Sequence, residues 1–138
     1  INHQNKELTN HVFNLKIKDR VFFLNEQKNL LEFYNGIDML ILSSHSESFP
    51  NVVAEAMLCS TPVLSSNAGC SKKIIKDCGF IMNNNDHRSI YKNLNRTINF
   101  YKYKRKKWKL LKHNSRLQIQ KNFSIPNMAN IYMKNWIF

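Results

Sequence analysis

Four short apolar runs, separated by segments of helical character, constrain the fold of this chain more than any other feature. The runs cover residues 21–24, 39–43, 63–65 and 80–82. Continuous runs of this length, rich in Val, Ile, Leu and Phe, are typical of parallel strands that are buried on both faces. Their alternation with helices predicts an α/β fold, a Rossmann-like parallel sheet with flanking helices.

The intervening and following segments have the spacing and the boundary residues of helices. Gly36 suits the end of one helix, and Pro50 suits the first turn of the next. The expected helices cover residues 2–15, 27–35, 50–59 and 124–138, with two further helices within 87–121. Ile74 and Ile75 are expected in a short helix. We expect one domain over residues 1–138, with a core at about 17–86 and basic helices at about 87–138.

Charge is divided unevenly along the chain, which carries a net charge of +12. Residues 1–86 hold 8 Lys or Arg and 9 Asp or Glu, whereas residues 87–138 hold 13 Lys or Arg and no acid. Such asymmetry indicates an acidic partner for one end. For residues 91–121 the alternatives are solvated helices packed on the sheet, helices that contact an anionic membrane surface, and, least favoured, a nucleic-acid site.

Cysteine and histidine usage argues against a metal or disulfide framework. The three cysteines lack paired spacing and the five histidines are scattered, which fits a reducing compartment. No run of about 18 apolar residues predicts a membrane span, and the first residues do not resemble a secretory leader. We expect a cytoplasmic location, with peripheral contact at the inner face of the cell membrane as an alternative.

The loop after the second apolar run is followed by a helix, and together they carry two acids. Glu47 lies in the loop and Glu55 in the second turn of the expected helix. In open parallel sheets ligands bind beyond the carboxyl ends of strands. Carboxylates accept hydrogen bonds from sugar hydroxyl groups, and the amides of Phe49, Asn51 and Val52 open a helix that suits a phosphate. This layout suits a nucleotide-diphosphate sugar; two unrelated surface acids are the alternative.

Residues 38–64, DMLILSSHSESFPNVVAEAMLCSTPVL, closely resemble the signature of family-four retaining glycosyltransferases of the GT-B fold, the glycosyl transferases of group 1. Glu47 and Glu55 match the two acids of the Glu-x7-Glu motif of that family. Further landmarks agree in order over nearly the whole chain: residues 19–24, Ala68-Gly69, Gly79-Phe80-Ile81 and Phe123-Ser124. The resemblance implies the carboxyl-terminal, donor-binding half of a GT-B enzyme.

The resemblance implies retaining transfer from a nucleotide-diphosphate sugar, without a metal or other cofactor, in bacterial capsule, lipopolysaccharide or glycolipid synthesis. It makes Glu47 the candidate catalytic residue and a ligand of the donor sugar, and Glu55 the ribose ligand. It assigns the remaining contacts with the donor sugar and diphosphate to Ser48, Phe49, Pro50, Asn51 and Val52. It assigns the contacts with the base to Asn25 and Glu26.

Four positions depart from the pattern of that family. Ser48, Ser60 and Asn25 stand where glycines are usual, and Lys73 reverses the charge of an acid. In the family, the Arg and Lys that neutralise the diphosphate, and an amino-terminal acceptor domain, would precede Ile1. We therefore expect weak nucleotide binding and negligible transfer by this chain. The alternative is a non-enzymatic basic module that keeps the fold and binds an anionic membrane or nucleic acid.

Overall fold

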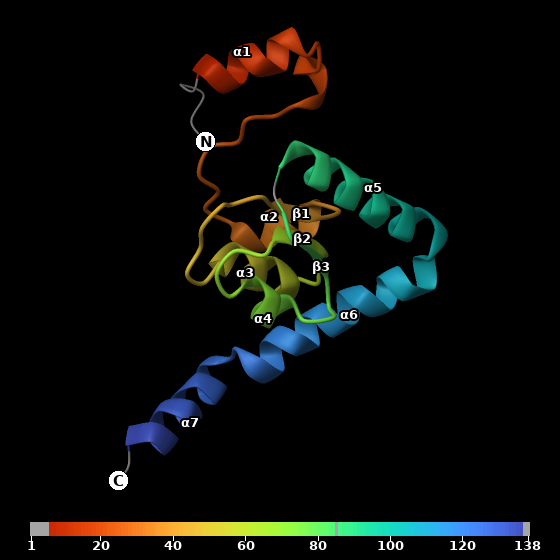
Figure 1. The fold of residues 1–138 in the computed structure, drawn as a ribbon. Coiled ribbons are helices and arrows are strands. Elements are labelled where there is room, and N and C mark those ends of the chain that lie inside the picture. Colours follow the sequence, from red (N-terminus) through yellow and green to blue (C-terminus); the bar gives the residue numbers. More distant parts are fainter. Residues whose placement is uncertain (1–5, 85, 137–138) are drawn as a thin grey trace. The chain divides into compact units, whose positions relative to one another are not determined.

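The computed structural model describes residues 6–84 and 86–136, and the chain divides into two compact units, Ile1–Phe33 and Tyr34–Phe138 (Figure 1). The first unit holds helix α1 (Lys6–Asn14) and the 3-10 helix η1 (Lys18–Arg20). Helix α2 (Leu30–Gly36) runs from the first unit into the second. The second unit continues with β1 (Leu40–Leu42), α3 (Asn51–Leu58), β2 (Val63–Ser66), α4 (Ser71–Ile75), β3 (Phe80–Met82), α5 (His87–Tyr103), α6 (Arg105–Asn122) and α7 (Ile125–Trp136).

The three strands form a parallel sheet in the order β1-β2-β3. Leu40 is paired with Val63, and Leu64 with Phe80. Every residue of the central strand β2 is buried. Helices α3, α4 and α5 pack on the strands, and α6 packs on α3 and α4 (Figure 1). The expected α/β fold with a parallel sheet and flanking helices is confirmed.

The core of the second unit lies between α3, α4 and the sheet. Val53, Ala56 and Met57 of α3 are fully buried, which is the spacing of one helical face. At the edge of the sheet an aromatic cluster joins β3 to α5 and α6. The ring of Phe80 lies 5.5 Å from that of Phe100 and 6.3 Å from that of Trp108.

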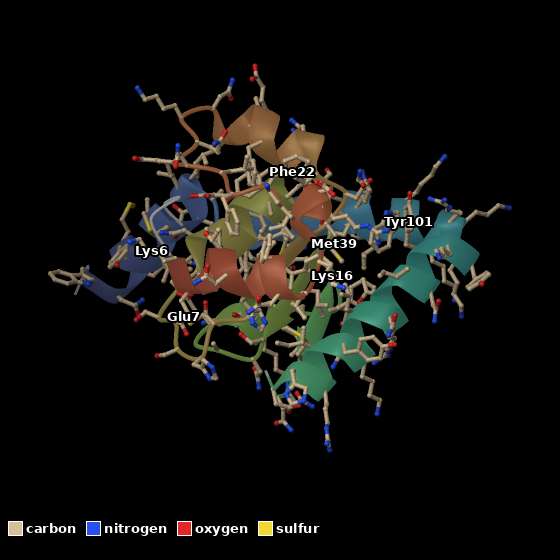
Figure 2. All side chains as sticks on the ribbon, turned by 90° about the horizontal axis from the view of Figure 1, so that it is seen from above. Lys6, Glu7, Lys16, Phe22, Met39 and Tyr101 are labelled. Atoms are coloured by element: carbon tan, nitrogen blue, oxygen red, sulfur yellow. The ribbon has the colours of Figure 1, made fainter. Side chains whose placement is uncertain are left out.

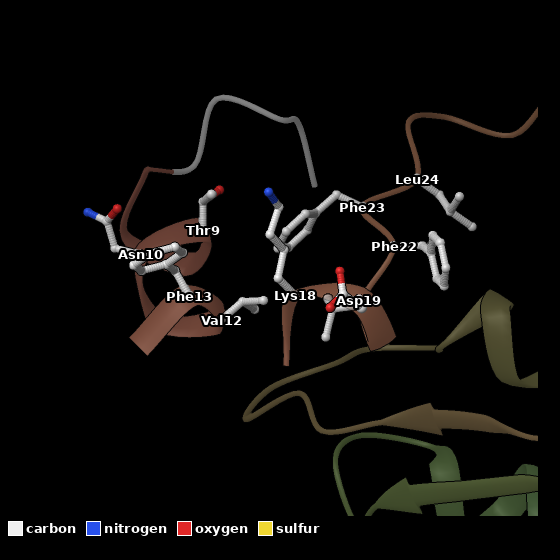
Figure 3. Close-up of a pocket in the computed structure, with 10 residues that line it drawn as sticks. Thr9, Asn10, Val12, Phe13, Lys18, Asp19, Phe22, Phe23 and Leu24 are labelled. Atoms are coloured by element: carbon white, nitrogen blue, oxygen red, sulfur yellow. The ribbon is translucent and has the colours of Figure 1, made fainter. Parts of the chain in front are cut away.

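Three of the four expected strands are present as β1, β2 and β3, but the strand expected at residues 21–24 is wrong. These residues form no strand in the described part of the chain, and Phe22 is 81% exposed. A strand is held by the ladder of a neighbour, and an apolar run does not supply one. Val21–Leu24 instead lines a groove of about 760 Å³ within the first unit, together with α1 residues that include Val12 and Phe13 (Figure 3).

The expected helices are present, with shifted ends. The first covers Lys6–Asn14, and residues 2–5 of the expected span lie outside the described residues, as do residues 137–138 of the last helix. The second begins at Leu30 instead of residue 27, and the Asn29 side chain accepts from the amide of Glu32 at 3.3 Å. Residues 87–121 do form two helices. The carboxylate of Asp86 accepts the amides of Arg88 and Ser89 at 3.0 Å and so begins α5.

Candidate functional site

The loop of residues 43–50 leaves β1 at its carboxyl end and leads directly into α3. Glu47 is half-buried and Pro50 is buried. The other residues of this loop and helix start that were expected to contact the donor sugar and diphosphate are exposed: Ser48, Phe49, Asn51 and Val52. The loop therefore offers both side chains and backbone to a ligand at the end of the sheet where open parallel sheets bind ligands.

The turn after β2 fixes the backbone of this loop at Gly69. Gly69 has a φ of +53°, in the left-handed region that glycine adopts without steric cost. A Cβ atom there would overlap the carbonyl group of Glu47 and lie 2.7 Å from the carbonyl oxygen of Ser48. The amide of Cys70 donates to the same Ser48 oxygen at 3.1 Å. Two neighbouring loops are thus held in contact, which preorganises the backbone around Glu47.

The amino end of α3 carries no side-chain cap, because its N-cap residue is Pro50. The amides of Val53 and Ala54 donate to the carbonyl oxygen of Pro50 at 3.0 and 3.5 Å. The amides of Asn51 and Val52, at the first two positions of the helix, have no intrahelical acceptor. An anion such as a diphosphate would supply the missing acceptor and would interact favourably with the helix dipole.

Glu55 lies one turn further along α3 and is half-buried. The hydroxyl group of Tyr34 donates to its Oε2 atom at 2.9 Å. Tyr34 is 3% exposed, and the hydroxyl group of Thr61 donates to its carbonyl oxygen at 2.6 Å. The carboxylate is therefore oriented by a buried tyrosine, while Oε1 and a second lone pair of Oε2 can accept hydroxyl groups of a ligand.

The pKa of Tyr34 is raised from 10.0 to about 12, first by burial and then by its hydrogen bond to Glu55. The hydroxyl group stays protonated near neutral pH and remains a donor. Tyr34 is not among the site residues that the sequence predicts. The available signal was a tyrosine in a helix that ends at Gly36, because a buried tyrosine requires a partner for its hydroxyl group.

A groove of about 730 Å³ begins at Phe49 and Asn51 and extends to α4, α6 and α7. The ring of Phe49 lies 5.8 Å from that of Phe123. Lys73, the position of reversed charge, lines the groove together with Lys76, and both lysines are exposed. Neither Glu47 nor Glu55 lines this groove. The start of α3, where a phosphate is predicted to bind, therefore lines the same groove as two lysines, whereas the two acids do not line it.

The two residues expected at the base, Asn25 and Glu26, belong to the first unit and are exposed. The side-chain amide of Gln27 donates to the carbonyl oxygen of Asn25 at 2.9 Å. Glu47 and Glu55 belong to the second unit. The assignment of Asn25 and Glu26 to the base stays a prediction.

A separate cavity of about 230 Å³ lies at the amino end of β1, and its lining residues include Met39 and Tyr101. Both residues are labelled in Figure 2. Within residues 6–84 and 86–136, no three His, Cys, Asp or Glu side chains gather as a metal site would require. Across the same residues, no helix is long and apolar enough to cross a membrane.

The parallel sheet with helices packed on it, and the helix α3 that follows the carboxyl end of β1, are features of the Rossmann-like class of α/β folds. Residues 2–117 match the model of the family described as glycosyl transferases group 1. The match covers most of the chain, and the chain belongs to this family.

Curated relatives are glycosyltransferases and related synthases. N-acetyl-alpha-D-glucosaminyl L-malate synthase of Bacillus anthracis is 39% identical over 72 residues, which are 51% of this chain and 19% of that protein. The capsular polysaccharide biosynthesis glycosyltransferase CapM of Staphylococcus aureus is 26% identical over 113 residues, 75% of this chain and 29% of that protein. The chain thus spans less than a third of the length of either relative.

A solved structure with the same fold is sucrose-phosphate synthase from Thermosynechococcus elongatus. The TM-score is 0.77 at 22% sequence identity, and the match covers 94% of this chain and 34% of that one. This likeness and the family match place the fold among the carboxyl-terminal domains of GT-B glycosyltransferases. The resemblance to that class is confirmed, and membership of family four stays a prediction.

Proposed function

We propose that this chain is the donor-binding part of a retaining glycosyltransferase that uses a nucleotide-diphosphate sugar. Its acceptor is a bacterial surface polysaccharide or glycolipid. The protein is located in the cytoplasm and contacts the inner face of the cell membrane peripherally. Membership of the glycosyl transferases group 1 supports the reaction class. The name of one relative, a capsular polysaccharide biosynthesis glycosyltransferase, supports the class of acceptor.

In this proposal the site binds the donor through two kinds of group. The carboxylates of Glu47 and Glu55 accept hydroxyl groups of the sugar and of the ribose. The amides of Asn51 and Val52 donate to the diphosphate, whose negative charge grows as its bond to the sugar breaks. Glu47 is the candidate catalytic residue because its loop would lie against the sugar. No metal is required by these contacts.

The observation that carries the proposal is the contact of Gly69 with the backbone of Glu47 and Ser48. It fixes the loop that begins the Glu-x7-Glu motif immediately before an uncapped helix start. The left-handed conformation and the close approach explain why a residue without a side chain stands at position 69. The same contact holds Glu47 and the first amides of α3 in one arrangement.

Calorimetric titration with UDP, GDP and their sugars tests this proposal. We expect weak binding of one of these compounds, reduced about tenfold or more in the Glu55→Gln variant, because the amide replaces an oxygen that accepts the ribose by a donor. Asp77→Asn removes an exposed acid that does not line the groove beginning at Phe49 and Asn51, and it is the matched control. Equal binding by Glu55→Gln and Asp77→Asn would contradict the assignment of Glu55.

We also propose that transfer requires parts of a longer protein. The chain spans 19% and 29% of two relatives. The purified 138-residue chain should therefore bind a donor without transferring its sugar. Sustained turnover by this chain would overturn this part of the proposal.

The second candidate function is a basic binding module that keeps the fold without catalysis. Exposed Ser48 and Lys73, both departures from the family pattern, favour it. The two candidates differ in the same titration. A module of this kind would bind simple polyphosphates as well as nucleotide sugars, and the Glu55→Gln variant would bind them as tightly as the unchanged chain.

A further inference from the structure

Helix α6 has two faces of opposite character. Its inner face is fixed in the fold, because α6 packs on α3 and α4 and buries Trp108, Ser115 and Ile119. The outer face lies on the other side of the helix. Leu110 and Leu117 lie there two turns apart and are 58% and 48% exposed. The exposed cations beside them are Lys106, Lys109 and Lys121. We call these five residues the α6 outer face.

The charge of this helix opposes its own stability. The first turn of α6 holds Arg105, Lys106 and Lys107 and no acid, and the N-cap residue Lys104 makes no side-chain hydrogen bond. Cations at the amino end of a helix interact unfavourably with the helix dipole. No acid between residues 87 and 138 offsets them. A surface evolved only for solubility would intersperse both signs, so the unbroken positive charge indicates an anionic partner.

The two leucines select the kind of anionic partner. A helix that binds nucleic acid contacts phosphates through cations and bases through aromatic or hydrogen-bonding groups. Exposed aliphatic side chains between lysines instead suit a lipid interface. There the leucines enter the boundary between headgroups and acyl chains while the lysines extend to the phosphates. About half of each leucine is exposed, because α6 faces α3 and α4 with its other side.

We propose that the α6 outer face binds the surface of a membrane that contains anionic lipids. Lys106, Lys109 and Lys121 attract the headgroups, and Leu110 and Leu117 insert between them. This surface is formed by α6 alone and does not depend on donor binding by Glu47 and Glu55. It gives the proposed acceptor class a physical reason, because a glycolipid acceptor is held in a membrane.

Sedimentation of the 138-residue chain with vesicles tests this proposal. Binding is expected with vesicles of phosphatidylcholine and phosphatidylglycerol and not with vesicles of phosphatidylcholine alone. The Lys106→Gln/Lys109→Gln variant should bind these vesicles at least about tenfold more weakly, because each cation near an anionic surface contributes to the attraction. The Leu110→Gln/Leu117→Gln variant keeps every charge and should also bind about tenfold more weakly.

The matched control is Arg88→Gln/Lys92→Gln, which removes two exposed cations from α5 and leaves α6 unchanged. It should weaken vesicle binding less than about threefold. A loss equal to that of the α6 lysine variant would mean diffuse attraction and would overturn the proposal. Absence of vesicle binding by the unchanged chain would also overturn the proposal. So would normal vesicle binding by the leucine variant, and binding of RNA or DNA would then favour a nucleic-acid site. Circular dichroism verifies that each variant is folded, and Glu55→Gln should retain full vesicle binding.

Discussion

The backbone conformation of Gly69 determines how closely its turn approaches the Glu47 loop of the candidate site. Alanine there would have to adopt a φ near +53° and would overlap the Glu47 carbonyl group. We expect Gly69→Ala to lower the free energy of unfolding by about 3 kcal/mol, from the left-handed conformation and the displaced loop together. Urea denaturation followed by circular dichroism measures this change.

The control for Gly69 is Gly36→Ala. A Cβ at Gly36, the last residue of α2, would meet no atom within 4 Å. This substitution should change stability by less than about 1 kcal/mol, because only the chain entropy of glycine is affected. Equal effects of the two alanines would show that the contact of Gly69 with the Glu47 loop contributes nothing.

Tyr34 should titrate later than a tyrosine of ordinary pKa. Its folded pKa of about 12 lies above the ordinary 10.0, so the folded protein holds this proton more tightly than the unfolded chain. Its contribution to stability is therefore complete below about pH 10 and is lost as the pH rises toward 12. Ultraviolet titration of phenolate absorbance should include a late step near pH 12. Tyr34→Phe should remove that step.

Tyr34→Phe also measures the hydrogen bond to Glu55. The change leaves the half-buried carboxylate without its donor and should lower the free energy of unfolding by about 1–2 kcal/mol. Tyr91→Phe, at a tyrosine that is 70% exposed, should stay within about 0.5 kcal/mol. A late titration step that persists in Tyr34→Phe would assign the raised pKa to another residue.

Some residues of the site are recognisable from a short stretch of sequence, and others are brought to the site only by folding. The Glu-x7-Glu spacing and the helix start at Pro50 are local, so Glu47, Glu55 and the open end of α3 could be located from the sequence. Tyr34 is 21 residues from Glu55, and only packing brings the two together. The charge reversal at Lys73 was visible in the sequence, but its place in a groove with Asn51 required the structure.

At the scale of elements, the aromatic cluster holds α5 and α6 on the sheet. Trp108 is 7% exposed, and its ring lies 5.1 Å from that of Tyr101 and 6.3 Å from that of Phe80. Trp108→Ala should lower the free energy of unfolding by about 3 kcal/mol through lost burial and the cavity that remains. Denaturation followed by circular dichroism in the far ultraviolet measures it.

Trp136→Ala is the matched control, because Trp136 is 77% exposed at the end of α7. It should change the free energy of unfolding by less than about 0.5 kcal/mol. If Trp108→Ala were equally mild, the cluster would not be what holds α5 and α6 to β3.

The helices and strands that could be predicted are those whose sequence contains both the expected apolar pattern and the residues that mark their ends. Apolar runs with helices between them located β1, β2 and β3, and Asp86 and Pro126 bracket the helical region that contains α5 and α6. The run at residues 21–24 has the same composition but no strand pairing. Pairing is a relation between two segments, and the composition of one segment does not reveal it.

For the whole molecule, burial is concentrated in the second compact unit. Val12 is the one buried residue among the described residues of Ile1–Phe33, while the remaining buried residues belong to Tyr34–Phe138. Stability against local opening follows the number of buried apolar contacts. The two units should therefore differ in their resistance to proteolysis, although the sequence predicts one domain.

Brief digestion with trypsin should cut first after Lys18, Arg20 or Lys28, which are exposed and lie outside the α-helices and strands. A fragment that begins near residue 29 and retains the second unit should persist, because cleavage requires an opened backbone and the core formed by α3, β2 and α4 opens less often. Mass spectrometry of the early products identifies the cuts. The exposed lysines of α6 are the internal control, since they are equally accessible but lie in a helix that is packed on α3 and α4. Early cuts within α6, with residues 16–28 intact, would contradict this distribution of stability.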